Sequence, residues 1–179
     1  MHPRITEVLE FLDQQRSVLI AAVAEVPPGD ADRRPSPERW SAAQVVSHLG
    51  SVEASIAGLF RQRLQEARDA GLGAEQDPSP ILPTLDIARL LDRERALVAS
   101  ERVRPPEAPV MDEVLATLER TRGILRRAVV LADGLAIGEV TAPHPFLGSL
   151  NLYQWLIFLA AHEARHAAQI RTIAETLAR

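Results

Sequence analysis

Three histidines have the residue type and spacing best suited to chemistry in this chain. His162 and His166 stand four residues apart, and His48 lies far upstream, between Val45 and Val52. All three fall on apolar stripes of helical period, and positions i and i+4 of a helix lie one above the other. Two neutral imidazoles so placed can bind one cation at about 2.0–2.1 Å each. The pattern therefore predicts a divalent metal site formed by His48, His162 and His166.

A single inward-facing histidine does not by itself indicate a metal. Such a residue is usually a core side chain whose ring nitrogens bond to a carbonyl or another polar neighbour. Three imidazoles in one core leave several donors and acceptors to satisfy, at about 1–3 kcal/mol each, unless they share a cation. We therefore expect a bound ion, Zn²⁺ or Ni²⁺, because imidazole suits both. Three neutral ligands leave at least one open coordination position, which is typical of a catalytic site.

The string from His162 to His166 also satisfies the H-E-x-x-H pattern of zinc proteases. Those enzymes need a third ligand downstream, and the 13 residues printed after His166 contain no histidine. Glu175 belongs to the same predicted helix and cannot swing back to the metal, and a helical bundle lacks the edge strand that aligns a peptide. We therefore set the protease interpretation aside. Glu163 remains a candidate catalytic residue beside the ligands, the alternative being a solvated carboxylate.

Four further residues are candidates for supporting the site. Gln169 and Glu53 can bond the outer ring nitrogens of the ligands, although surface or interhelical hydrogen bonds are an alternative for both. Arg165 is a candidate catalytic residue that binds a substrate carboxylate at the pocket rim, and a surface ion pair is the alternative. His144 lies between two prolines and either punctuates a loop or lines the pocket.

The composition excludes several other kinds of chemistry. The 179 residues include 24 acidic and 20 basic side chains, so the net charge is −4 and no global positive field attracts nucleic acid. Cysteine is absent, which excludes disulfides, thiolate nucleophiles and sulfur-ligated metals. Every basic residue is arginine, which excludes a lysine Schiff base.

Helices must position these residues, because proline clusters divide the chain into windows long enough for helices. Apolar residues in the windows recur every 3.6 residues without convincing alternation, so we expect an all-α fold. Ser41 and Asn151 are each followed three residues later by glutamine, which predicts capping boxes at two helix starts. These features predict a single four-helix bundle over residues 1–179 with a short additional helix. The expected helices are about 4–26, 41–70, 85–102 (the additional one), 111–131 and 152–177.

The sequence also sets expectations for location and assembly. The first residues lack the basic head and unbroken apolar run of a signal peptide, and no stretch approaches about 18 uncharged apolar residues. We expect a cytoplasmic protein without a membrane partner. The apolar faces of so small a bundle also make a homodimer an expectation.

Two stretches resemble the DinB/YfiT-like metalloproteins, a family of four-helix bundles. The first, WSAAQVVSHL at 40–49, matches the family's tryptophan, capping residue and His-Leu pair of the second helix. The second comprises HPFLG at 144–148 and HEARHAAQI at 162–170, and matches the family's H-P-x-x-G loop and H-E-x-R-H-x-x-Q-I helix. Together with the helix order, the resemblance covers essentially the whole chain.

The resemblance implies a bundle that binds Zn²⁺ or Ni²⁺ through a three-histidine site, which falls on His48, His162 and His166. It also implies thiol-dependent transferase or isomerase activity that uses a low-molecular-weight thiol. The expected function is therefore metal-dependent transfer of such a thiol to a small electrophile, or a related hydrolase or isomerase activity on a small molecule. The alternative is a non-catalytic bundle that binds a ligand or partner, with a structural metal or none.

Overall fold

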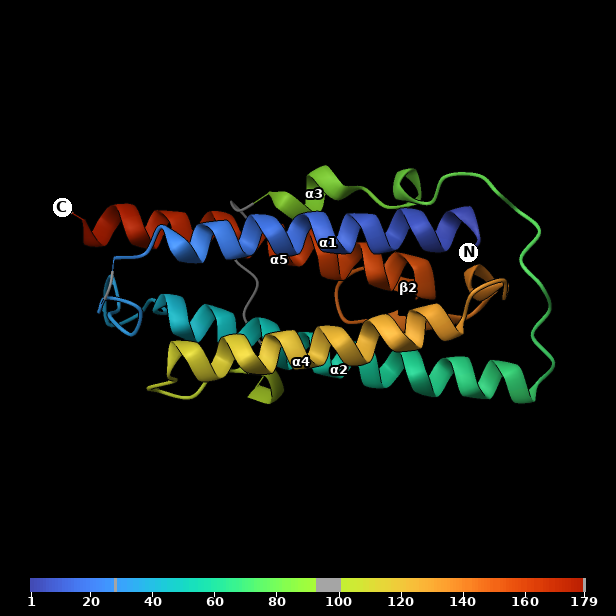
Figure 1. Cartoon of the computed structure of the whole chain (residues 1–179), viewed down its shortest axis with the longest axis horizontal. Coiled ribbons are helices and arrows are strands. Elements are labelled where there is room, and N and C mark those ends of the chain that lie inside the picture. The colour runs from blue at the N-terminus through green and yellow to red at the C-terminus, as the bar shows by residue number, and fades with distance from the viewer. Residues whose placement is uncertain (28, 93–100, 179) are drawn as a thin grey trace.

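The computed structural model describes residues 1–27, 29–92 and 101–178. Within them, the predicted all-α four-helix bundle with a short additional helix is confirmed. Figure 1 shows α1 beside α5 and α2 beside α4, so the bundle consists of two helix pairs packed on each other. The helices are α1 Pro3–Ala24, α2 Ala42–Asp69, α3 Ile87–Leu91, α4 Met111–Leu131 and α5 Leu152–Leu177.

Two capping boxes determine where the histidine-bearing helices α2 and α5 begin. The Ser41 side chain accepts a hydrogen bond from the Gln44 backbone N–H at 3.2 Å, and the Ser41 N–H donates to Gln44 Oε1 at 3.0 Å. Asn151 and Gln154 form the same reciprocal pair, at 2.9 and 3.0 Å. Each capping side chain satisfies a backbone N–H that the first turn leaves unpaired, which is worth about 1 kcal/mol. Both predicted helix starts are therefore confirmed.

Two apolar clusters form the core, one on each side of the middle of the bundle. The larger one takes residues from the first half of α1 and the second half of α2, such as Leu12 and Phe60. The smaller one takes residues from the opposite halves of the same helices, such as Leu19 and Leu49. Full burial of such side chains contributes about 1.5–3 kcal/mol each. These clusters hold the helices together, and the candidate site lies near their boundary.

A β-hairpin leads into α5, although no convincing alternation in the sequence predicts a strand. Strands β1 Thr141–His144 and β2 Gly148–Asn151 pair antiparallel, with Thr141 opposite Asn151. Four-residue strands are too short to establish a period of two, and Pro143 lies in one of them. The hairpin delivers the chain to the N-cap of α5 and brings His144 against that helix.

The additional helix is shorter than expected in the part that can be described. The sequence predicts one helix over 85–102, but α3 ends at Leu91. The part of that prediction covering 93–100 lies outside the described residues. In the chain as described, none of the helices is sufficiently long and apolar to span a lipid bilayer. Within the described ranges there are also three 3₁₀ turns: η1 Leu82–Thr84, η2 Glu101–Val103 and η3 Ile137–Glu139.

Candidate metal centre

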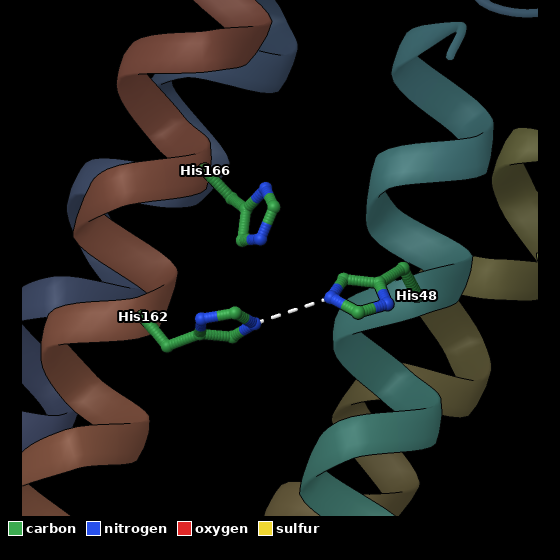
Figure 2. A group of neighbouring side chains, drawn as sticks. All are labelled: His48, His162 and His166. Atoms are coloured by element: carbon green, nitrogen blue, oxygen red, sulfur yellow. Dashed lines mark hydrogen bonds between the residues drawn. The ribbon is translucent and has the colours of Figure 1, made fainter. Parts of the chain in front are cut away.

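The structure brings His48, His162 and His166 together between α2 and α5 (Figure 2). His48 lies in the first half of α2, and His162 and His166 lie on successive turns of α5. One ring nitrogen from each residue lies within 4.8 Å of the other two. Nε2 of His48 lies 3.2 Å from Nε2 of His162. His48 and His166 are buried, and His162 is partly exposed.

Hydrogen bonds on the far side of two rings determine which nitrogen faces the centre. His48 Nδ1 lies 2.8 Å from the Val103 carbonyl oxygen, and His166 Nδ1 lies 2.7 Å from Gln169 Oε1. Both oxygens only accept, so each Nδ1 carries the proton and donates it. In the neutral ring, Nε2 then keeps its lone pair for a cation. Gln169 thus lies where the predicted supporting role requires it.

The separation of the His48 and His162 ring nitrogens fits a shared transition-metal ion. Two nitrogen ligands of a tetrahedral ion, each about 2.0–2.1 Å from it, lie about 3.3–3.4 Å apart. The separation of 3.2 Å between the Nε2 atoms of His48 and His162 is close to that value. Within the described ranges, the group contains these three histidines and no carboxylate. A neutral all-nitrogen set of this kind suits both Zn²⁺ and Ni²⁺.

Burial favours the neutral form of two of these imidazoles, His48 and His162. It lowers the pKa of His48 below the usual histidine value, against the opposing hydrogen bond to Val103. Burial also lowers the pKa of His162 well below that value, and the neighbouring His166 and His48 lower it further. A histidine with a lowered pKa is uncharged at neutral pH. The neutral ring is the form that binds a metal ion.

Aromatic rings surround the triad. The Trp40 ring lies 5.1 Å from that of His48, and the Phe158 ring stacks on His162 at 5.5 Å between centroids. His144, from β1, packs against Phe158 at 4.4 Å. Its Nδ1 also accepts a hydrogen bond from a backbone N–H two residues further on. His144 therefore closes its turn, and the Phe158 ring connects it to His162 of the triad.

The comparisons with known proteins identify the family. Residues 11–170 match the DinB superfamily. This chain belongs to the DinB superfamily. It is 26% identical over 149 residues to uncharacterized protein YuaE of Bacillus subtilis (strain 168), over 83% of this chain and 85% of the relative. The crystal structure of TT2238, a four-helix bundle protein, matches with a TM-score of 0.62 and 24% identity, over 94% of this chain and 98% of that chain.

These findings confirm the resemblance that the two sequence motifs indicated. The match with TT2238 shows that this DinB superfamily member shares its bundle fold over nearly its whole length.

In this DinB protein Glu163 is buried, so the alternative of a solvated carboxylate is wrong. Its side chain is 1% exposed, and Oε1 accepts hydrogen bonds from Arg16 at 2.6 Å and Arg122 at 2.9 Å. Oε2 is buried and has no hydrogen-bond partner among the described residues. Burial raises the pKa of the Glu163 carboxyl, while Arg122 and Arg16 oppose the rise. These contacts are those of a buried ion cluster, and the catalytic role of Glu163 remains a prediction.

Glu53 belongs to the same ion cluster and does not support a histidine. It is fully buried and accepts hydrogen bonds from Arg16 at 2.8 Å, Arg122 at 2.5 Å and Thr121 at 2.9 Å. The interhelical alternative is therefore the correct one. The physical reason is its position: five residues after His48, the side chain points well away from the ligand face of α2.

Arg165 joins α5 to the end of α3. Its Nη1 donates to the carbonyl oxygen of Leu90 at 3.4 Å and also to that of Asp92. Its charge lies near enough to His162 to help lower the pKa of that ring. The described contacts thus anchor Arg165 beside the triad, and its catalytic role remains a prediction.

Two components of the site region were missed in the sequence. Arg122 is 6% exposed, and it is not among the candidate residues named from the sequence. It lies four residues after Leu118 and three before Leu125, so its place on the apolar stripe was an available signal. The Val103 carbonyl that orients His48 gives no such signal, because any residue can supply a backbone carbonyl.

Proposed function

We propose that this DinB superfamily protein is an enzyme that holds Zn²⁺ or Ni²⁺ on His48, His162 and His166. The proposed reaction is transfer of a low-molecular-weight thiol to a small electrophile, or a related hydrolase or isomerase reaction on a small molecule. The observation that carries the proposal is the convergence of three ring nitrogens from two helices within 4.8 Å.

The protein's own residues would prepare the site for an ion. The Val103 carbonyl and Gln169 hold two imidazoles in the tautomer whose Nε2 carries the lone pair. Because all three ligands are neutral, the full charge of the cation would be retained. A divalent ion bound here supplies a Lewis acid that lowers the pKa of a coordinated thiol or water. The chain has no cysteine, so the thiol would have to be a separate substrate.

The rings beside the triad would form the contact surface for a small substrate. Trp40 lies against His48, and Phe158 lies against His162 with His144 behind it. Aromatic side chains of this kind bury apolar substrate surface and limit the access of water to the reacting groups. The net charge of −4 favours a small-molecule partner over nucleic acid.

Metal analysis of purified protein tests the binding step. We expect about one equivalent of Zn²⁺ or Ni²⁺ in the wild type and none in His166→Ala, with unchanged helical content by circular dichroism. His2→Asn is a matched control, because His2 caps α1 outside the triad through its Nδ1, and the asparagine side-chain oxygen can accept the same hydrogen bond. Equal metal content in wild type and His166→Ala would refute the site.

A screen of thiols against small electrophiles then tests the chemistry. We expect thiol consumption by the metal-loaded wild type and none by His166→Ala. A metal-bound protein that consumes no thiol and hydrolyses no substrate would favour the non-catalytic alternative, in which the bundle binds a ligand or partner.

A further inference from the structure

A layer of charged side chains crosses the bundle core between the two apolar clusters. Along each long helix, residues of the larger apolar cluster lie on one side of this layer, and residues of the smaller cluster lie on its other side. All its members are buried except Arg16, whose side chain is 11% exposed. Burying two arginines and two glutamates is unfavourable unless all are paired, and such clusters add little net stability. This charged layer consists of Arg16 from α1, Glu53 from α2, Thr121 and Arg122 from α4, and Glu163 from α5.

Each arginine of the charged layer bridges both carboxylates. Arg122 donates from Nε to Glu53 Oε1 at 2.5 Å and from Nη2 to Glu163 Oε1 at 2.9 Å. Arg16 donates from Nη2 to Glu53 Oε2 at 2.8 Å and to Glu163 Oε1 at 2.6 Å. Since Glu53 is on α2 and Glu163 on α5, these two helices are joined twice.

The same arginines also bond to the backbone of the other helix pair. Arg122, on α4, donates to the Leu12 carbonyl of α1 at 2.9 Å. Arg16, on α1, donates to the Leu118 carbonyl of α4 at 3.4 Å. A guanidinium is a rigid planar fork whose donors have fixed directions. The charged layer therefore favours one register of the four helices along the bundle axis.

The two helices joined by the carboxylates are the two that carry the imidazoles. Glu163 directly follows His162 on α5, and Glu53 lies five residues after His48 on α2. A slip of one residue between these helices moves the rings by about 1.5 Å. A metal site tolerates deviations of only about 0.2 Å in its bond lengths. Apolar contacts are non-directional, so they resist such a slip only through the shapes of the side chains.

We propose that the charged layer is a positioning device for the metal centre. It holds α2 and α5 in the register at which His48 meets His162 and His166, so Arg16 and Arg122 are positioning residues that act through the histidines. This inference rests on the proposed metal site. The layer contains two positive and two negative side chains, so it adds no net charge beside a cation and its role is geometric.

Two substitutions of opposite charge separate geometry from electrostatics. Glu53→Gln removes a negative charge near the site, and Arg122→Met removes a positive one. A purely electrostatic layer would make the first variant bind a cation more weakly and the second more tightly. A positioning layer makes both bind more weakly, by about 10–100-fold, as for other outer-shell partners. Arg126→Met is the matched control. Arg126 on α4 also forms an ion pair with a carboxylate of another helix, Asp13 on α1, but these two side chains are 47% and 53% exposed.

The measurement is a titration of each metal-free protein with Co²⁺, whose visible absorption reports the number and arrangement of its ligands. It is made below the unfolding transition of every variant. We expect wild type and Arg126→Met to agree, and Glu53→Gln and Arg122→Met both to lose affinity and change the spectrum. Unchanged affinity in both variants, or tighter binding by Arg122→Met, would overturn the inference. If Arg122→Met does not fold, Arg122→Lys replaces it with the same expected direction, since lysine keeps the charge but not the fork.

Crystal structures of the metal-free variants keep this inference separate from the proposed function. If the wild type binds no Co²⁺, the proposed metal site is refuted, and the crystal structures alone decide the inference. We expect the separation of His48 Nε2 and His162 Nε2 to increase beyond 3.2 Å in Glu53→Gln and Arg122→Met. An unchanged separation in both variants would overturn the inference.

Discussion

Replacing Glu53 with alanine is expected to destabilise the protein by about 3–5 kcal/mol, because it leaves buried arginine charge without its partner. Glu53 is fully buried and accepts three hydrogen bonds, from Arg16, Arg122 and Thr121, at 2.5–2.9 Å. Each such hydrogen bond to a charged group is worth about 1.5–3 kcal/mol. The sum of the three is an upper limit on the loss, because Arg16 and Arg122 still donate hydrogen bonds to Glu163 in the variant. Domains are usually stable by only about 5–15 kcal/mol, so the loss is a large fraction of the total.

Urea denaturation at neutral pH, monitored by circular dichroism, measures this loss. We expect the urea concentration at the unfolding midpoint to fall, while the dependence of the unfolding free energy on urea concentration stays unchanged. Asp13→Ala is the matched control, because it also removes a carboxylate from an interhelical pair with an arginine, but this pair is half exposed. We expect the control to cost less than about 1 kcal/mol. If Glu53→Ala costs no more than Asp13→Ala, the buried pairing described here is refuted.

Substitutions at four other positions test separate parts of the structure. Gln169→Ala is expected to weaken metal binding about 10–100-fold in a Co²⁺ titration, because the ring of His166 loses its outer acceptor, while Gln169→Glu keeps the acceptor and the affinity. Ser41→Ala is expected to lower the unfolding free energy by about 1 kcal/mol in urea, since it removes the N-cap of α2; an unchanged midpoint would contradict the capping role. Gly58→Ala, where an added Cβ meets nothing within 4 Å, should stabilise α2 by up to about 1 kcal/mol. Gly148→Ala, at φ +78°, should destabilise the hairpin by about 1–2 kcal/mol, and thermal melts giving both variants the same sign would refute this pair.

Much of the candidate centre was predictable because its signals are local. The spacing of His162 and His166 follows from helical geometry alone, and the apolar stripe on α2 indicated that His48 faces inward. The boxes at Ser41 and Asn151 involve groups three residues apart, so the sequence contains everything needed to recognise them. Gln169 was recognisable as a partner of His166 for the same reason.

By itself, then, the sequence determined the four long helices, the starts of α2 and α5, the bundle class and the inward positions of the three histidines, because each depends on residues within a few turns of one another. The charged layer depended on the tertiary structure, since the partners of Arg122 come from three other helices. The hydrogen bond from His48 to the Val103 carbonyl also depended on the tertiary structure, because the path of a distant segment determines which backbone group reaches the ring. Only packing brings groups so far apart in the chain into contact, and packing also made Glu163 a member of the buried ion cluster, which neither interpretation of its sequence position included.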